Sequence, residues 1–176
     1  MIKLKDILNE VDDKQLYYHV SSNAYKPGDV IKPYFNPNKY AEDVITDVHS
    51  RQIMKQVDDI LTKAKPSKAS SRDKSIFVFK TKSDAKRYSM NMPGNRKIYE
   101  VAVNSNVEWH DMNWIDYIFG KAVGWSLGTM PDYVLKQLKS YAKLYWNGES
   151  IVDHTSGYFK KPIWEGIVNT SVKIVS

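Results

Sequence analysis

The chain has 176 residues, 42% of them hydrophobic and 12% aromatic, which is enough apolar surface for one folded domain and argues against disorder. It contains no cysteine, so disulfides, cysteine-ligated metals and thiol nucleophiles are excluded. The sequence shows no apolar run of membrane-spanning length and no signal-peptide pattern at its start. We therefore expect a single-domain cytoplasmic protein with no membrane partner.

Positive charge is concentrated in the middle of the chain. Residues 51–100 carry 13 Lys and Arg against 5 Asp and Glu, and the whole chain has a formal net charge of +6. Such a basic stretch attracts anionic partners, which include nucleic acids, dinucleotides and acidic proteins. A lysine-rich surface that only aids solubility accounts for the same pattern.

Hydrophobic spacing predicts the elements of the first half of the chain. The spacing of apolar residues favours a short helix over residues 2–10, which makes 1–14 a helical extension, and a long amphipathic helix over 40–64 that ends before Pro66. Residues rich in β-favouring side chains predict strands at 16–20 and 30–31.

The second half continues as a mixture of strands and helices. Alternation and turn residues predict strands at 75–79, 97–103, 163–168 and 172–175, and helices at 84–90 and 131–145. The fold class is therefore α+β, with a mixed and mostly antiparallel sheet.

Familiar catalytic motifs are missing from the sequence. The four histidines show no metal-ligand spacing, so we expect no metal site. The chain also lacks a P-loop, a nucleophile elbow and a Rossmann glycine fingerprint.

Two polar residues stand out within predicted strands. His19 lies between Tyr18 and Val20, where it is either a satisfied structural residue or a group facing a cleft. Glu165 lies in an otherwise apolar strand, where an ionised carboxylate must be paired or functional. Gly166 follows it and would let another chain or a ligand approach closely.

Several segments together resemble the ADP-ribosyltransferase superfamily, in its diphtheria-toxin and PARP-like branch and in small members of the rifampin ADP-ribosyltransferase type. The first is Tyr17–Ser22 with the turn at 26–31, which looks like the first strand and turn of that family. The others are 66–72, 75–81 and 83–88, the strand at 98–103 and the strands at 164–168 and 172–174. The resemblance implies a split sheet with flanking helices over residues 15–176.

The resemblance implies that NAD is the substrate and that its nicotinamide bond is cleaved. His19 would hydrogen-bond an NAD ribose and Glu165 would stabilise the oxocarbenium-like centre, a role that suits a fixed anion. Phe79 and Tyr88 would flank the nicotinamide ring. The further NAD-binding residues on this interpretation are Ser21, Ser22 and Arg72.

Some positions depart from the family pattern and leave alternatives open. Phe79 stands where the family commonly has Tyr, so the ring keeps its stacking surface and loses a hydroxyl. Asp111 is an alternative to Glu165 as the catalytic carboxylate, because the rifampin-modifying relatives use an Asp at a comparable place. The acceptor of ADP-ribose would be a protein or a nucleic acid.

A second hypothesis assigns the chain no catalysis. The basic central stretch, with Phe77, Phe79 and Tyr88 as stacking platforms, would then bind nucleic acid, or the chain would be a host-interaction protein. The opening residues are similar to those of small proteins of large tailed phages.

Overall fold

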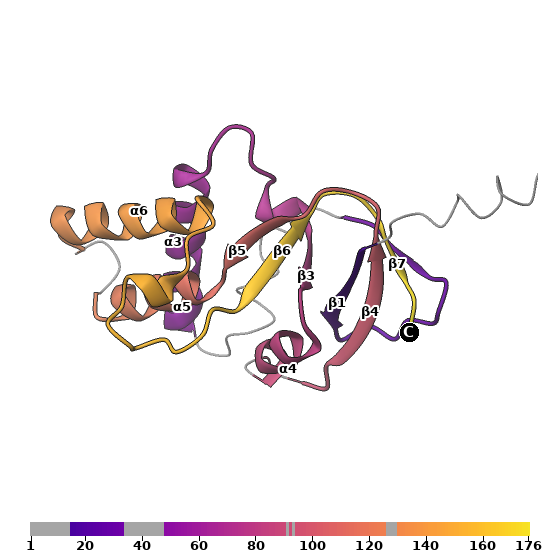
Figure 1. Ribbon diagram of the computed structural model, residues 1–176. Coiled ribbons are helices and arrows are strands. Elements are labelled where there is room, and N and C mark those ends of the chain that lie inside the picture. Colours follow the sequence, from indigo (N-terminus) through magenta and orange to yellow (C-terminus); the bar gives the residue numbers. More distant parts are fainter. Residues whose placement is uncertain (1–14, 34–47, 91, 93, 126–129) are drawn as a thin grey trace, which may run out of the picture.

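A computed structural model describes residues 15–33, 48–90, 92, 94–125 and 130–176 (Figure 1). Its strands are β1 Gln15–Ser21, β2 Val30–Ile31, β3 Ile76–Phe79, β4 Lys97–Val103, β5 Glu108–Asp111, β6 Trp164–Val168 and β7 Val172–Ile174. Its helices are α3 Val48–Ala64, α4 Lys82–Met90, α5 Asn113–Val123 and α6 Asp132–Trp146, with 3-10 turns at Arg72–Lys74 and Ile151–Asp153.

Most of the predicted elements are present within a few residues of their expected bounds. The six predicted strands correspond to β1, β2, β3, β4, β6 and β7, and two predicted helices correspond to α4 and α6. The predicted helix over 40–64 is confirmed from Val48 onward, and its first part lies outside the described residues, as does the helix expected over 2–10. β5 and α5 were not predicted.

The strands form one seven-stranded sheet in the order β2-β7-β4-β1-β3-β6-β5. Every pairing between the described strands is antiparallel, so the α+β prediction is confirmed and the sheet is more uniform than expected. β1 pairs with β4 along its whole length, whereas its register with β3 joins Tyr18 to Phe79 alone.

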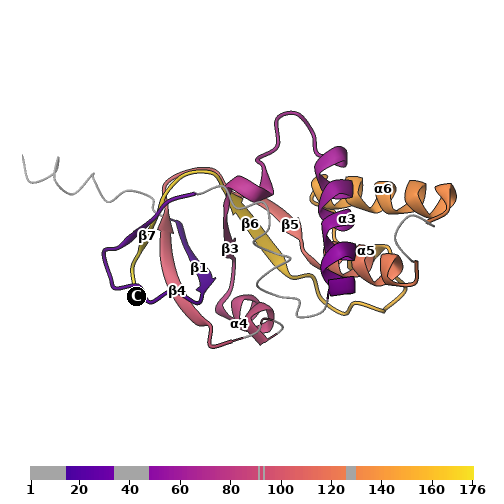
Figure 2. The ribbon, with the colours of Figure 1, turned by 180° about the vertical axis from the view of Figure 1, so that it is seen from behind.

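The four helices pack against one face of the sheet. α3, α5 and α6 bury Phe77 of β3 and Ile167 of β6 in one cluster, beside β5 and β6 in Figures 1 and 2. α4 lies near β3 and buries Phe79 with Tyr18 in a second cluster. Because paired residues in a sheet share a face, both clusters lie on the same side.

Strand side chains fill the opposite face. Val78, Val101, Val168 and Ile174, from four different strands, pack there, with Trp109 of β5 against them. Val78 and Val101 are completely buried. The sheet therefore has an apolar core on each side, which accounts for the continuous apolar run of β3.

None of the helices in the described part of the chain is long and apolar enough to cross a membrane.

Candidate functional site

Glu165 lies in the second position of β6 and is completely buried. The sheet register pairs it with Phe79 of β3 on one side and with His110 of β5 on the other. Its carboxylate therefore projects onto the helix-covered face, between the cluster under α4 and the cluster under α3, α5 and α6.

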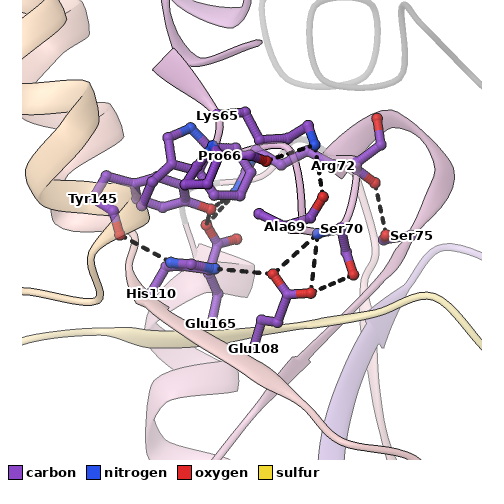
Figure 3. A network of polar contacts seen from close by, with 12 residues as sticks. Lys65, Pro66, Ala69, Ser70, Arg72, Ser75, Glu108, His110, Tyr145 and Glu165 are labelled. Atoms are coloured by element: carbon purple, nitrogen blue, oxygen red, sulfur yellow. Dashed lines mark hydrogen bonds and ion pairs between the residues drawn. The ribbon is translucent and has the colours of Figure 1, made fainter. Parts of the chain in front are cut away.

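Two side chains bind the same oxygen of this carboxylate. Arg72 forms an ion pair with Glu165 Oε1, and the Tyr145 hydroxyl donates a hydrogen bond of 2.8 Å to that oxygen. Arg72 also donates to the Tyr145 hydroxyl oxygen, which closes a three-membered polar network (Figure 3). Burial raises the pKa of Tyr145 well above its usual value, so the phenol stays protonated and remains a donor.

The second oxygen of Glu165 is different. Oε2 is buried and has no hydrogen-bond partner among the described residues. A buried carboxylate oxygen without a donor is uncommon in folded proteins and calls for an explanation. Glu165 is thus oriented through Oε1, whereas Oε2 is enclosed by the protein without a donor.

Aromatic rings contact Arg72 in addition to its ion pair with Glu165. Its guanidinium lies 4.7 Å from the ring centroid of Phe77 and 5.3 Å from that of Tyr145, and its side chain is 12% exposed. Asp58 of α3 is also close enough to be influenced by this cation. Burial raises the pKa of Asp58 to about 6, although the charge of Arg72 acts to lower it.

His110 and Glu108 extend the network along β5. His110 Nδ1 donates to the Tyr145 carbonyl at 2.9 Å, and the imidazole stacks on the Tyr145 ring with centroids 4.6 Å apart. Burial lowers the pKa of His110 and favours its neutral form, so Nε2 carries no proton. That nitrogen has no hydrogen-bond partner in the described structure and lies 4.0 Å from Glu108 Oε2.

Glu108 in turn binds the segment that precedes β3. The Ser70 backbone N–H lies 3.0 and 3.1 Å from the two carboxylate oxygens, and the Ser70 hydroxyl donates to one of them. Within that segment, Lys65 Nζ donates to the carbonyls of Ala69 at 2.6 Å and Pro66 at 3.2 Å (Figure 3).

Asp111, the alternative carboxylate, is occupied by the backbone. Oδ1 accepts hydrogen bonds from the N–H groups of Asn113 and Ile163 at 3.1 Å, and Oδ2 accepts one from Ile151 at 3.0 Å. The side chain is completely buried, and burial raises its pKa despite these donors. Asp111 therefore joins three chain segments and has no free oxygen.

His19 is not brought together with Glu165. Tyr18 is paired with Phe79, so strand alternation places Tyr18 on the face of Glu165 and His19 on the opposite face. The neighbours agree, because Tyr18 packs in the Phe79 cluster whereas Tyr99, the β4 partner of His19, packs in the other. His19 Nδ1 donates to the Phe77 carbonyl at 2.9 Å, which bridges β1 and β3.

Ser21 and Ser22 lie where β1 ends. The Ser21 hydroxyl accepts a hydrogen bond from the Asn23 N–H at 3.1 Å, which makes it part of the turn. Ser22 is exposed. Neither residue contacts the network around Glu165 through any of these bonds.

Phe79 and Tyr88, the two rings expected to flank nicotinamide, lie against each other. Their ring centroids are 4.9 Å apart with the planes tilted by 37°, in the cluster under α4. Phe79 is 1% exposed and Tyr88 9% exposed, so neither ring offers an open surface to a nucleic-acid base. This burial removes two of the three stacking platforms expected for a nucleic-acid-binding surface.

Gly166 does not provide space for a ligand. A Cβ at this position would lie 2.9 Å from side-chain atoms of both Trp109 and Val78, and closer still to Val107. The side chains of the neighbouring strands therefore fill the space that the missing Cβ leaves. The close approach expected at Gly166 is therefore made by side chains of the protein itself and not by a ligand.

Tyr145, His110, Glu108 and Ser70 were missed as members of the site. Tyr145 follows the helical apolar pattern of α6, so its spacing predicts a core residue and gives no sign of the hydroxyl's partner. Within the described residues, no three His, Asp or Glu side chains cluster as metal ligands would. No protein-family model and no curated protein matches the sequence.

Proposed function

We propose that this protein is an NAD-dependent mono-ADP-ribosyltransferase that cleaves the bond between nicotinamide and ribose, with Glu165 as the catalytic carboxylate. One observation carries the proposal. Tyr18, Phe79 and Glu165 form a row across three adjacent strands, and that row ends in a buried carboxylate with one oxygen unbound. All three strands are among those on which the family resemblance was stated.

The proposed chemistry requires a fixed negative charge. As nicotinamide departs, positive charge develops on the ribose, and a preorganised carboxylate in a dry site stabilises that charge without reorganisation. Tyr145 donates to Oε1 and fixes the orientation of the carboxylate, so it is a positioning residue. Oε2 is then the oxygen that faces the ribose.

The aromatic pair next to Glu165 supplies the wall for the nicotinamide ring. Phe79 is the direct sheet neighbour of Glu165, and Tyr88 of α4 lies against Phe79. Both rings are buried, as Glu165 is, so the proposal requires that the movement that opens Glu165 also exposes them to the nicotinamide, whose direction of departure they would then constrain.

Two residues of the original hypothesis receive structural roles. His19 lies on the other face and bridges β1 to β3, so the proposed reaction assigns it no contact with the ribose of the nicotinamide. Asp111 has both oxygens bound by backbone N–H groups, which favours Glu165 over Asp111 as the catalytic group.

The test is release of nicotinamide from NAD by the purified protein, with and without a cell lysate that supplies protein and nucleic-acid acceptors. We expect release that is lost in Glu165→Gln. Binding of an oligonucleotide that weakens steeply with salt, without any release of nicotinamide, would instead support the nucleic-acid-binding hypothesis and contradict the proposal.

A further inference from the structure

The catalytic carboxylate proposed above is closed off from solvent. Glu165 is completely buried, so NAD cannot reach Oε2 unless part of the protein moves. The chain between α3 and β3, residues 65–75, supplies the cation on Glu165 and is called the strap below. Figure 3 shows Pro66, Ala69, Ser70 and Arg72 gathered on one side of the carboxylates of Glu165 and Glu108.

Bonds within the strap make it a unit. Lys65 binds the carbonyls of Pro66 and Ala69, the Ala69 N–H donates to the Pro66 carbonyl at 3.0 Å, and the Ser75 hydroxyl donates to the Ser71 carbonyl at 2.7 Å. These contacts do not involve the sheet or the helices. These local bonds hold the shape of the segment, and its Ala69 also packs against the cluster under α3, α5 and α6.

Two carboxylates attach the strap to the sheet. Ser70 is bound to Glu108 of β5 by its N–H and its hydroxyl, and Arg72 is bound to Glu165 of β6. Arg72 is partly exposed while its partner Glu165 is not, so the arginine lies on the outward side of the pair. Tyr145, the other partner of Glu165, is fixed within α6 and completely buried.

We propose that the strap regulates the Glu165 site by closing it, with Ser70 and Glu108 as its latch. In the closed state the Arg72 guanidinium occupies the carboxylate in place of the cationic ribose of the substrate. In the open state Arg72 leaves and Tyr145 continues to orient Oε1. This inference rests on the proposed function for its biological meaning, but the opening itself is independent of NAD.

The latch is tested by carbodiimide labelling of carboxylates with glycine ethyl ester, read by mass spectrometry. Glu165 is the carboxylate under test, and two others serve as internal references. Asp153 is exposed and reports that the reagent is active, whereas Asp111 is completely buried, as Glu165 is, and reports general unfolding. The variant is Ser70→Ala, which removes the hydroxyl bond to Glu108, and the control is Ser67→Ala at an exposed position of the same strap.

We expect Ser70→Ala to raise the labelling rate of Glu165 by about tenfold, because losing a hydrogen bond to a charged group increases the open population. Asp111 should stay protected, and Ser67→Ala should behave as the wild type. Unchanged protection of Glu165 in Ser70→Ala would overturn the inference. Labelling of Asp111 together with Glu165 would also overturn it, because the opening would then be general unfolding.

The activity assay separates this inference from the proposed function. If Ser70→Ala exposes Glu165 and nicotinamide release rises with it, both stand. If Glu165 becomes labelled but no variant releases nicotinamide, the strap is supported and the proposed function fails. If the wild type releases nicotinamide and exposure of Glu165 in Ser70→Ala leaves the rate unchanged or lowers it, the regulatory role of the strap is wrong.

Discussion

Arg72 and Glu165 are 93 residues apart in the sequence and form an ion pair in which the carboxylate is completely buried. Removing one partner of such a pair leaves an uncompensated charge in the interior, which is more destabilising than the pair is stabilising. The shared hydrogen bonds to Tyr145 join the segment before β3, the end of α6 and the strand β6 at one point.

Tyr145→Phe tests the contribution of this joint to stability. The change removes the donor to Glu165 Oε1 without opening a cavity, and we expect the free energy of unfolding to fall by about 2 kcal/mol, the value of a hydrogen bond to a charged group. Urea unfolding measures it. Tyr133→Phe on the same helix, where the side chain is 67% exposed, should be neutral, and equal effects of the two changes would contradict the account.

Asp111→Asn tests the structural assignment of the alternative carboxylate. An amide nitrogen cannot accept from a backbone N–H, so at least one of the three bonds is lost and we expect destabilisation of about 1–3 kcal/mol. Nicotinamide release by the folded variant should persist. Loss of release with unchanged stability would show that Asp111 acts in the chemistry. Asp153→Asn, at an exposed position, is the control.

Gly166→Ala tests the packing behind Glu165. The new methyl group would meet Val78 of β3, Trp109 of β5 and Val107 just before β5, and we expect a loss of about 1–3 kcal/mol from overpacking. Gly120→Ala provides the contrast, because nothing lies within 4 Å of its Cβ position and alanine favours the helix. A neutral Gly166→Ala in thermal unfolding would mean that the sheet has room at this position.

Asp58→Asn tests whether burial raises the pKa of this carboxyl group on α3, which also senses the charge of Arg72 in the strap. Because burial raises the pKa of Asp58 to about 6, the folded state binds the proton more tightly than the unfolded state does. This contribution to stability is full below pH 4 and is lost as the pH rises through 6. We expect Asp58→Asn to match the wild type near pH 4 and to exceed its stability by roughly 1–2 kcal/mol at pH 8. A difference independent of pH, or the same profile in Asp59→Asn, would refute this.

Much of the sheet could be predicted from the sequence, because strand alternation is a local signal. The anomaly of Glu165 was also visible, since a carboxylate among apolar neighbours must be paired, and the structure shows that pairing. β5 was not predicted because three of its four residues, Glu108, His110 and Asp111, are polar or charged and give no apolar strand signal. α5 was not predicted because an aromatic-rich sequence containing Gly120 hides its helical period.

The partners of Glu165 could not be predicted. Arg72 and Tyr145 are 93 and 20 residues away, and no periodicity within a strand or helix encodes such a contact. The separation of His19 from Glu165 has a similar origin. It depends on the register of Tyr18 with Phe79, and a shift of one residue would have placed His19 on the other face.

The central claim is that Glu165 performs NAD chemistry, and the rate of nicotinamide release in Glu165→Gln tests it most directly. Glu100→Gln is the matched control. Glu100 lies in the same sheet, where it pairs with Tyr18, and its carboxylate accepts a hydrogen bond from Ser176 and not from Arg72 or Tyr145. When the rates of nicotinamide release are compared per folded molecule, we expect Glu165→Gln to be slower than the wild type by about 100-fold or more. We expect Glu100→Gln to release nicotinamide at the wild-type rate. Equal rates in the two variants, or no release by the wild type, would contradict the claim.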